Sequence, residues 1–385
     1  MNARALLVAL LLLTGCDERP ASEGFAGLGQ GSEHFAPVVP GKVFSFPADH
    51  GAHPDFRIEW WYVTANLSDT EGHHYGVQWT LFRNALRPGA DQPGWSNGNL
   101  WLGHAGLTTE TRQFAAQTQG RGGIGQAGVT AAPFAAWIDD WRLAGDLAGR
   151  AQVQARGPGF AYRLELAATG PLVLQGEGGV SRKSASGQAS YYYSQPFFQA
   201  QGELEIEGRR VPVKGLAWLD REWSSQHLAA DQLGWDWFSL HLDDGRQLML
   251  YRLRQADGQH YLFGNLIAAD GHNQPLHPGD IRLAPEATHT VAGRKVPVRW
   301  SIILPGQQLD LRIAAVNPDA WMALGTPYWE GPVRVEGSAK GDGLPGDDGV
   351  LTKAERRLPD ASRPGTPGPA PASNPYLLLP LRRAR

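Results

Sequence analysis

The chain has little of what marks several protein classes. It contains one cysteine, Cys16, in 385 residues, so an internal disulfide bond is excluded. No stretch reaches the ~20 apolar residues that a membrane-spanning helix needs. The net charge is −3, and there is no basic run or RNA-binding motif, which argues against nucleic acid as a partner.

Motifs for cofactors and metals are also missing. No Gly-rich phosphate loop or dinucleotide fingerprint follows a strand and opens a helix, so we expect no cofactor. The 12 histidines are scattered, and His73 and His74 lie in a polar turn, so we expect no metal site. The segment GWSNG, residues 94–98, matches the G-x-S-x-G motif of serine hydrolases. A strand rather than a helix follows it, so we interpret it as a loop.

The N-terminus has the features of an export signal. Arg4 precedes a nine-residue apolar run from Ala5 to Leu13, and the run ends in LTGC at Cys16. This ending resembles a bacterial lipobox, in which Cys16 is lipidated and becomes the mature N-terminus. Asp17 resembles a signal that retains lipoproteins at the inner membrane, so we expect an envelope lipoprotein anchored there and facing the periplasm. The alternative is a soluble secreted protein with an ordinary signal.

The remaining chain predicts an all-β protein of two similar halves. Residues 16–42 are rich in Gly, Ser and Pro, as a flexible tether is. From Val43 onward, short strands alternate with turn residues, which indicates antiparallel barrels or sandwiches. A strand–turn–strand pattern that opens at Trp60 recurs at Trp235, which suggests two copies of one β domain. We expect domains at residues 43–205 and 206–340, followed by a Pro- and Gly-rich disordered tail at residues 341–385.

Tryptophan is abundant, with 14 residues, and it surrounds two acids in GLAWLDREWSSQ, residues 215–226. Strand alternation places Trp218, Asp220, Glu222 and Ser224 on one face. The same rule groups Trp235, Trp237, Ser239 and His241, and also Trp60, Tyr62, Thr64 and Asn66. Faces that mix aromatic and a few polar groups are typical of ligand cavities. The alternative is that the two acids form ion pairs, with Arg221 and Arg252, that fix strand register.

These segments also carry a family resemblance. The sequence resembles the AttH-like proteins, often labelled predicted secreted hydrolases, in EWWYVTANL, YGVQWTLFR, GHAGLTT, ASYYYSQP and GLAWLDREWSSQ. These proteins are distant relatives of bacterial carotenoid 1,2-hydratases. The resemblance covers residues 43–337 and implies two tandem lipocalin-like antiparallel β-barrels. It also implies a role beside an ABC exporter.

One feature departs from the family pattern. Relatives close with a Gly-Tyr-x-Glu-x-Thr-Gly-Tyr strand after YWEG, whereas here the Pro-rich tail follows YWEGPVRVEG, residues 328–337. Either the reading frame shifted late in the gene or this member ends differently. Without a closing strand, the second barrel would have an open edge.

The first functional hypothesis is a cofactor-free hydratase acting on a terpenoid or lipid-like molecule. A carboxylic acid among tryptophans has a raised pKa and can protonate an alkene, while tryptophan faces stabilise the carbocation and a second carboxylate takes a proton from water. The resemblance to the hydratases implies that Asp220 occupies the position of their catalytic aspartate. Around it, however, this chain has Trp218 and Arg221 where relatives often carry Tyr and His. The candidate catalytic residues are Asp220, Glu222, Trp218, Trp237 and His241. The candidate ligand-binding residues are Trp60, Trp61, Tyr62, His104, Trp223, Trp235 and Tyr251.

The second hypothesis is a carrier or chaperone for a lipophilic molecule, held at the membrane by Cys16 and working with an ABC transporter permease. Tryptophan-rich walls suit this role equally well, because lipocalin-like barrels bind hydrophobic ligands. A third hypothesis, an ester hydrolase, rests on the family label alone, since no nucleophile–base pair can be identified in the sequence.

Overall fold

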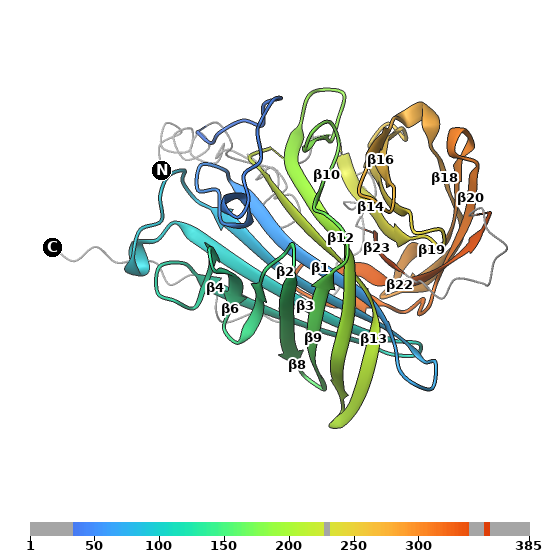
Figure 1. The fold of residues 1–385 in the computed structure, drawn as a ribbon, viewed down its shortest axis with the longest axis horizontal. Coiled ribbons are helices and arrows are strands. Elements are labelled where there is room, and N and C mark those ends of the chain that lie inside the picture. Colours follow the sequence, from blue (N-terminus) through green and yellow to red (C-terminus); the bar gives the residue numbers. More distant parts are fainter. Residues whose placement is uncertain (1–33, 227–231, 339–349, 355–385) are drawn as a thin grey trace, which may run out of the picture.

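The structure is a computed structural model, and it describes residues 34–226, 232–338 and 350–354 (Figure 1). The described chain is all-β, as predicted, with four short 3-10 helices: η2 (Ala48–His50), η3 (Gly94–Ser96), η4 (Pro278–Asp280) and η5 (Pro305–Gln307). None of its helices is long and apolar enough to cross a membrane. The expected signal peptide, Cys16 and most of the expected tether lie outside the described residues.

The first sheet has 13 antiparallel strands. Eleven of them follow the order β4-β3-β2-β1-β13-β12-β9-β8-β7-β6-β5, while β10 and β11 pair with β12. The two end strands, β4 and β5, are joined by residues 122–126 alone, so the sheet curves into a nearly closed barrel, here called the first barrel. The strands are β1 (Ile58–Ser68), β2 (His74–Ala85), β3 (Asn99–Thr109), β4 (Gln113–Arg121), β5 (Ala127–Ala131), β6 (Phe134–Ile138), β7 (Trp141–Gly145), β8 (Arg150–Gly157), β9 (Phe160–Ala168), β10 (Val173–Leu174), β11 (Val180–Arg182), β12 (Ala189–Ile206) and β13 (Arg209–Ser224).

The second sheet is smaller, and Figure 1 shows it curled beside the first barrel. Nine strands follow the order β17-β16-β15-β14-β23-β22-β20-β19-β18, and β21 pairs with β22. Its end strands are again consecutive in the chain, joined by residues 277–281. The strands are β14 (Gln232–His241), β15 (Gln247–Gln255), β16 (His260–Ile267), β17 (Asn273–Leu276), β18 (Arg282–Val291), β19 (Arg294–Leu304), β20 (Leu309–Ala315), β21 (Trp321–Met322), β22 (Tyr328–Gly337) and β23 (Val350–Ala354).

Two boundaries differ from the expectations. The strand β13 pairs with β1 from Ser224 to Lys214, so the first sheet extends past the joint expected near residue 205. The boundary between the sheets lies between Ser224 and Gln232. In the expected disordered tail, residues 350–354 form β23 between β14 and β22, where we expected an open edge. The rest of that tail lies outside the described residues.

Strand alternation creates three separate apolar clusters. On β1, Trp61 and Val63 point into the first barrel and belong to its core, while Tyr62 points the other way. On β14, Phe238 belongs to the core of the second sheet, and its neighbour Trp237 points away from that core. Tyr62 and Trp237 meet in the third cluster, which combines residues of both sheets. This third cluster, here called the interface layer, lies between the outer face of the first barrel and the second sheet.

Candidate active site between the two sheets

A row of polar side chains crosses the first barrel on the face that the second sheet covers. The strand registers pair His104 with Thr80, Thr80 with Tyr62, Tyr62 with Asp220, and Asp220 with Ser194. Directly opposite residues in antiparallel strands share a face, so these five side chains, from β3, β2, β1, β13 and β12, point into the interface layer. All five are buried. A buried polar row requires partners or a function, because unpaired polar groups are costly in a protein interior.

The second sheet supplies the opposite wall of the layer. The ring of Trp237 meets the edge of Tyr62 at 5.6 Å between centroids. The Tyr62 hydroxyl donates a hydrogen bond to Glu330 on β22, and the Tyr328 hydroxyl lies 3.0 Å from Nδ1 of His104. Burial, with the Glu330 carboxylate, raises the pKa of Tyr62 well above its usual range. Tyr62 is therefore a neutral hydrogen-bond donor at physiological pH.

Asp220 lies at the centre of the layer and has an uneven environment. Its Oδ1 accepts hydrogen bonds from Tyr192 Oη at 2.7 Å, Ser194 Oγ at 2.6 Å and Trp218 Nε1 at 2.8 Å. Its Oδ2 is buried without a hydrogen-bond partner among the described residues. Burial raises the pKa of Asp220 to about 7, although the three donors lower it; the Glu222 carboxylate contributes to the rise. Because Oδ1 accepts all three hydrogen bonds, the proton of the neutral acid resides on Oδ2.

Glu222 lies two residues further along the same face and has a different partner. Lys183 Nζ is 2.7 Å from its Oε1, and the Ser190 hydroxyl donates to the same oxygen. The Lys183 ammonium also lies 4.2 Å from the ring centre of Tyr251. Burial lowers the pKa of Lys183, and Glu222 opposes this change. Glu222 is thus the acid of a buried ion pair, whereas the hydrogen-bond donors to Asp220 are neutral groups.

The alternative that the two acids pair with Arg221 and Arg252 is wrong. Arg221 forms its ion pair with Glu59, and Arg252 Nε lies 2.6 Å from Asp236 Oδ2. Strand alternation explains this, because Arg221 and Asp236 point into the sheet cores, away from the acids.

Three further polar groups of β14 face the layer. His241 Nε2 donates to the Pro196 carbonyl at 3.1 Å, and its ring meets the edge of Trp218 at 5.8 Å. Burial lowers the pKa of His241 to about 4, so the imidazole is neutral. Trp237 Nε1 and Ser239 Oγ are buried without a partner among the described residues. Together with Asp220 Oδ2, they are groups that a bound ligand could satisfy.

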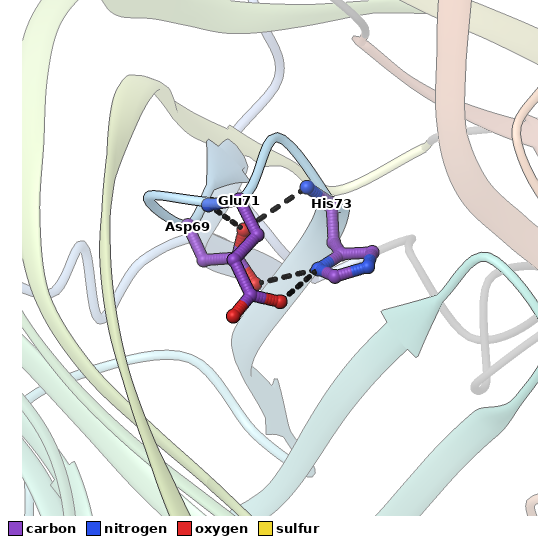
Figure 2. A group of neighbouring side chains, drawn as sticks. All are labelled: Asp69, Glu71 and His73. Atoms are coloured by element: carbon purple, nitrogen blue, oxygen red, sulfur yellow. Dashed lines mark hydrogen bonds and ion pairs between the residues drawn. The ribbon is translucent and has the colours of Figure 1, made fainter.

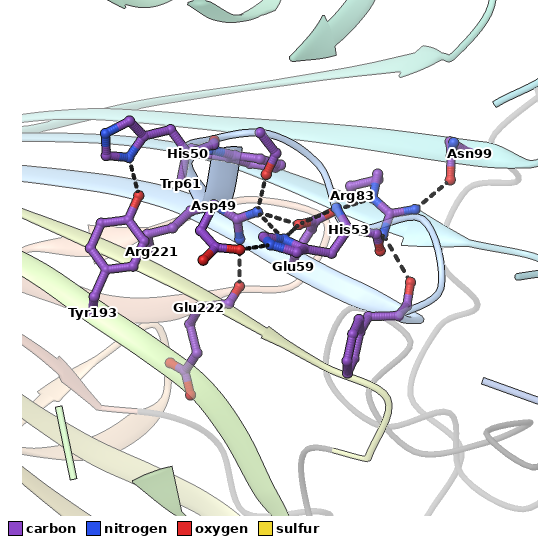
Figure 3. Close-up of polar contacts among 12 residues, drawn as sticks. Asp49, His50, His53, Glu59, Trp61, Arg83, Asn99, Tyr193, Arg221 and Glu222 are labelled. Atoms are coloured by element: carbon purple, nitrogen blue, oxygen red, sulfur yellow. Dashed lines mark hydrogen bonds and ion pairs between the residues drawn. The ribbon is translucent and has the colours of Figure 1, made fainter. Parts of the chain in front are cut away.

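The structure does not bring every candidate into the layer. Trp60, Trp235 and Tyr251 belong to it, but Trp61 and Trp223 lie on the opposite face, in the core of the first barrel. Figure 3 shows Arg221 on that inner face, while the Glu222 carboxylate points away. The Arg221 guanidinium stacks 3.9 Å from the ring centre of Trp61 and 4.9 Å from that of Trp223. These two tryptophans are part of the charged network that closes one end of the first barrel.

One group of side chains has the donor types of a metal site. Asp69, Glu71 and His73 lie in the turn between β1 and β2, with ligand atoms within 4.8 Å of one another (Figure 2). The Asp69 carboxylate already accepts hydrogen bonds from the main-chain nitrogens of Glu71 and His73, from His73 Nδ1 and from the Tyr75 hydroxyl. These hydrogen bonds close the turn around the Asp69 carboxylate, and they account for the short distances among the three side chains.

Two large surface hollows lie away from the polar row. They measure about 900 and 690 Å³ and lie on the outside of β8, β9 and β12. Charged side chains of both signs line them, including Arg156, Arg163, Glu165 and Glu203. An apolar ligand needs an apolar wall, so we place the candidate site in the interface layer despite the size of these hollows.

Comparisons with known proteins agree with the fold. The family model described as AttH-like matches residues 37–344. The chain belongs to the AttH-like family. The crystal structure of a candidate AttH from Nitrosomonas europaea is 34% identical and has a TM-score of 0.72, over 83% of this chain and 99% of that one. Kievitone hydratase from Nectria haematococca is 14% identical with a TM-score of 0.59, over 84% of this chain and 95% of that one, which shows a shared fold. No curated protein matches the chain.

Sequence reasoning missed several residues of this site, Thr80 and Ser190 among them. Tyr192 and Ser194 support Asp220, Lys183 pairs with Glu222, and Glu330 and Tyr328 come from β22. Alternation within ASYYYS could have placed Tyr192 and Ser194 on one face, and YWEG places an acid directly after two large aromatics. Lys183 lies in an irregular segment after β11, and no periodic pattern points to it.

Proposed function

We propose that this AttH-like protein is a cofactor-free acid–base enzyme of the hydratase type, acting on a hydrophobic unsaturated molecule of terpenoid or lipid-like character. The observation that carries the proposal is the state of Asp220. It is a buried acid with a pKa of about 7, with three donors on Oδ1 and no described residue within hydrogen-bond reach of Oδ2. A pKa close to the working pH is what a general acid requires.

The two sheets are, in this proposal, two lipocalin-like barrels that hold the ligand at their shared face rather than in their lumens. The consecutive end strands of each sheet support two closed or nearly closed units. The aromatic rings of the layer support binding of an apolar ligand, because Trp218, Trp237 and Tyr62 surround the acid. Stacking on such rings also contributes about 0.5–2 kcal/mol per ring to a nearby cation.

The proposed reaction adds water to an alkene. Asp220 Oδ2 transfers its proton to one alkene carbon, which breaks the π bond and leaves a carbocation on the other carbon. The three donors at Oδ1 stabilise the Asp220 carboxylate that results. Water attacks the cation and gives its proton to Glu222, the nearest carboxylate along β13, which yields an alcohol. Return of this proton to Asp220 through solvent restores the starting state.

The first test uses the chain from Asp17 with terpenoid and acyclic polyene substrates in isotope-labelled water. Mass spectrometry of the extracted products should show label in the polyene with wild type and none with Asp220→Asn. The exposed Asp243→Asn variant is the matched control and should behave as wild type. Polyenes that remain unlabelled while they co-purify with both Asp220 proteins would reject hydration of these substrates and favour the carrier hypothesis.

The cellular context is a separate proposal. The LTGC segment supports lipidation of Cys16 and anchoring at the inner membrane facing the periplasm, where an ABC transporter permease is a candidate partner. Labelling of cells with a radioactive fatty acid should mark the wild-type protein and not the Cys16→Ser variant. Equal labelling of both proteins, or labelling of neither, would contradict this proposal.

A further inference from the structure

Within residues 34–226 and 232–338, all exposed large hydrophobic side chains lie in the first third of the chain. Trp95 is 72% exposed, Val43 is 86% exposed and Leu86 is 64% exposed. The full set, here called the apolar end, is Val39, Val43, Phe46, Leu86, Trp95, Leu100 and Ile124. Single exposed hydrophobic residues are normal on a protein surface, but their confinement to one region indicates a contact surface.

Strand register shows why these residues gather at one end of the first barrel. Ile58 pairs with Asn84, Ala85 with Asn99, and Leu100 with Arg121. The segment before β1, the loop between β2 and β3, and the loop between β4 and β5 therefore all leave the barrel at the same end. The seven side chains come from these three segments and from Leu100 at the start of β3.

Hydrogen bonds hold this end in a defined shape. Gly94 N donates to Gly123 O at 2.7 Å, and Gly89 N donates to Pro54 O at 3.1 Å, so the two loops and the N-terminal segment are tied together. Earlier in the N-terminal segment, Val39 N donates to Tyr191 Oη on β12 at 2.9 Å. Trp95 is therefore held in an exposed position by a loop of defined shape. Exposure of its apolar ring to water is unfavourable, which indicates that a partner covers it.

We infer that the apolar end docks onto the surface of a lipid bilayer, with Trp95, Leu86 and Ile124 entering the headgroup region. The chain reaches His34 from Cys16, the expected lipid anchor, through about 18 residues. The composition of this segment predicts a tether, and a random-coil chain of that length has a root-mean-square span of roughly 25 Å, so we expect the anchor to keep this end close to the membrane. Tryptophan favours the membrane interface because its ring is apolar and its indole N–H is polar.

The charges at this end define the kind of docking. Arg87 and Arg121 are exposed there, and so are Asp55 and Asp91. Because both signs are present, the contact depends on insertion of apolar side chains rather than on attraction to anionic lipids. Binding to vesicles is therefore expected to change little with salt concentration. The same end contains the start of β1 and the end of β13, so it brings the Glu222 side of the interface layer closest to the bilayer.

The experiment uses the chain from Asp17, which keeps every described residue, lacks the lipid anchor and contains no cysteine. A fluorescent probe that brightens in apolar surroundings is attached through Ser96→Cys, beside Trp95, or through Glu71→Cys in the β1–β2 turn at the opposite end. Vesicles of phosphatidylethanolamine and phosphatidylglycerol should shift the emission to the blue only for the Ser96→Cys protein. Combining Trp95→Ser, Leu86→Ser and Ile124→Ser should lower vesicle binding at least fivefold.

Three outcomes would overturn the inference. Equal responses of the two probes, or no vesicle binding above that of the triple variant, would show that this end does not meet the bilayer. Dimerisation of wild type in analytical ultracentrifugation, lost in the triple variant and accompanied by no vesicle binding, would assign the apolar end to a second copy of the chain. Unchanged circular dichroism of the triple variant is the control for folding, since all three side chains are exposed.

Discussion

Two buried carboxylates of the first barrel contrast sharply. Glu59, at the closed end of the barrel, lies between the guanidinium groups of Arg83 and Arg221, with His53 Nδ1 at 3.2 Å (Figure 3). Asp220, on the outer face, receives hydrogen bonds from three neutral donors, all of them at Oδ1. Burial acts on both acids, yet the pKa of Glu59 is held well below its usual range and that of Asp220 rises to about 7. The partners, not the burial, decide which acid stays charged.

The comparison assigns different roles to the two acids. Arg83 also donates to Asn99 at 2.8 Å and to the main chain at His53 and Phe56, so the Glu59 network ties the N-terminal segment to β1, β2 and β13. An ion-pair network with matched charges stabilises the fold and has no need to exchange protons, so we assign it a structural role. Asp220 is the acid that can lose and regain a proton near neutral pH, as catalysis requires.

The largest expected effect breaks the matched network. Glu59→Gln leaves two buried guanidinium groups without their counter-charge, and it should lower the free energy of unfolding by about 3–5 kcal/mol. Urea denaturation measures this change. The matched control is Glu203→Gln, which removes an exposed ion pair with Arg210 and should cost less than about 1 kcal/mol. A similar small loss in both variants would contradict the assigned role of Glu59.

The second prediction concerns pH. The folded-state pKa of Asp220, about 7, lies above the ~3.9 expected for the unfolded chain, so folding takes up a proton between these values. The stability that Asp220 contributes is complete at low pH and is lost as the pH rises through the folded pKa. Relative to Asp220→Asn, wild type should lose on the order of 3 kcal/mol between about pH 5 and pH 8. Parallel pH profiles of the two proteins in urea denaturation would reject a raised pKa.

The third and smallest expected effect concerns a single hydrogen bond, the one that Ser194 donates to Asp220. Ser194→Ala removes one of the three donors to Asp220 Oδ1 and so destabilises the carboxylate form. The pKa of Asp220 should rise by about one unit, because a hydrogen bond to a charged group contributes about 1.5–3 kcal/mol. The pH dependence of hydration would report the shift. Ser301→Ala on β19 is the control, and a shift there, or none for Ser194→Ala, would contradict the assignment of the donors.

The sequence predicted the strands and their alternation well. It grouped Trp218 with Asp220 and Glu222 on one face, and the structure confirms that grouping. It could not tell which side of the barrel that face occupies, because both faces of β13 are buried from Ala217 to Ser224 and carry large aromatics. Trp223 was therefore taken for a ligand contact although it lies in the core of the first barrel.

Two contacts of the site, Lys183 with Glu222 and Tyr62 with Glu330, were beyond sequence reasoning for a different physical reason. Lys183 and Glu222 are far apart in the chain, and their pairing depends on how β11 and β12 run beside β13. The contact between Tyr62 and Glu330 depends on how one sheet docks on the other. Such contacts follow from tertiary packing, which local periodicity does not encode. The sheet boundary was placed too early because β13 reads as the first strand of a new unit, whereas its pairing with β1 places it in the first sheet.

The most direct test of this account is the titration of the Asp220 carboxyl group itself. Carbon-13 labelling of aspartate side chains, with Asp220→Asn to assign the signal, allows its ionisation to be followed by nuclear magnetic resonance. The account predicts a protonated carboxyl at about pH 5 and a midpoint near 7. A carboxylate already ionised at about pH 5 would show that Asp220 is an ordinary buried anion, and the proposed general acid would be lost.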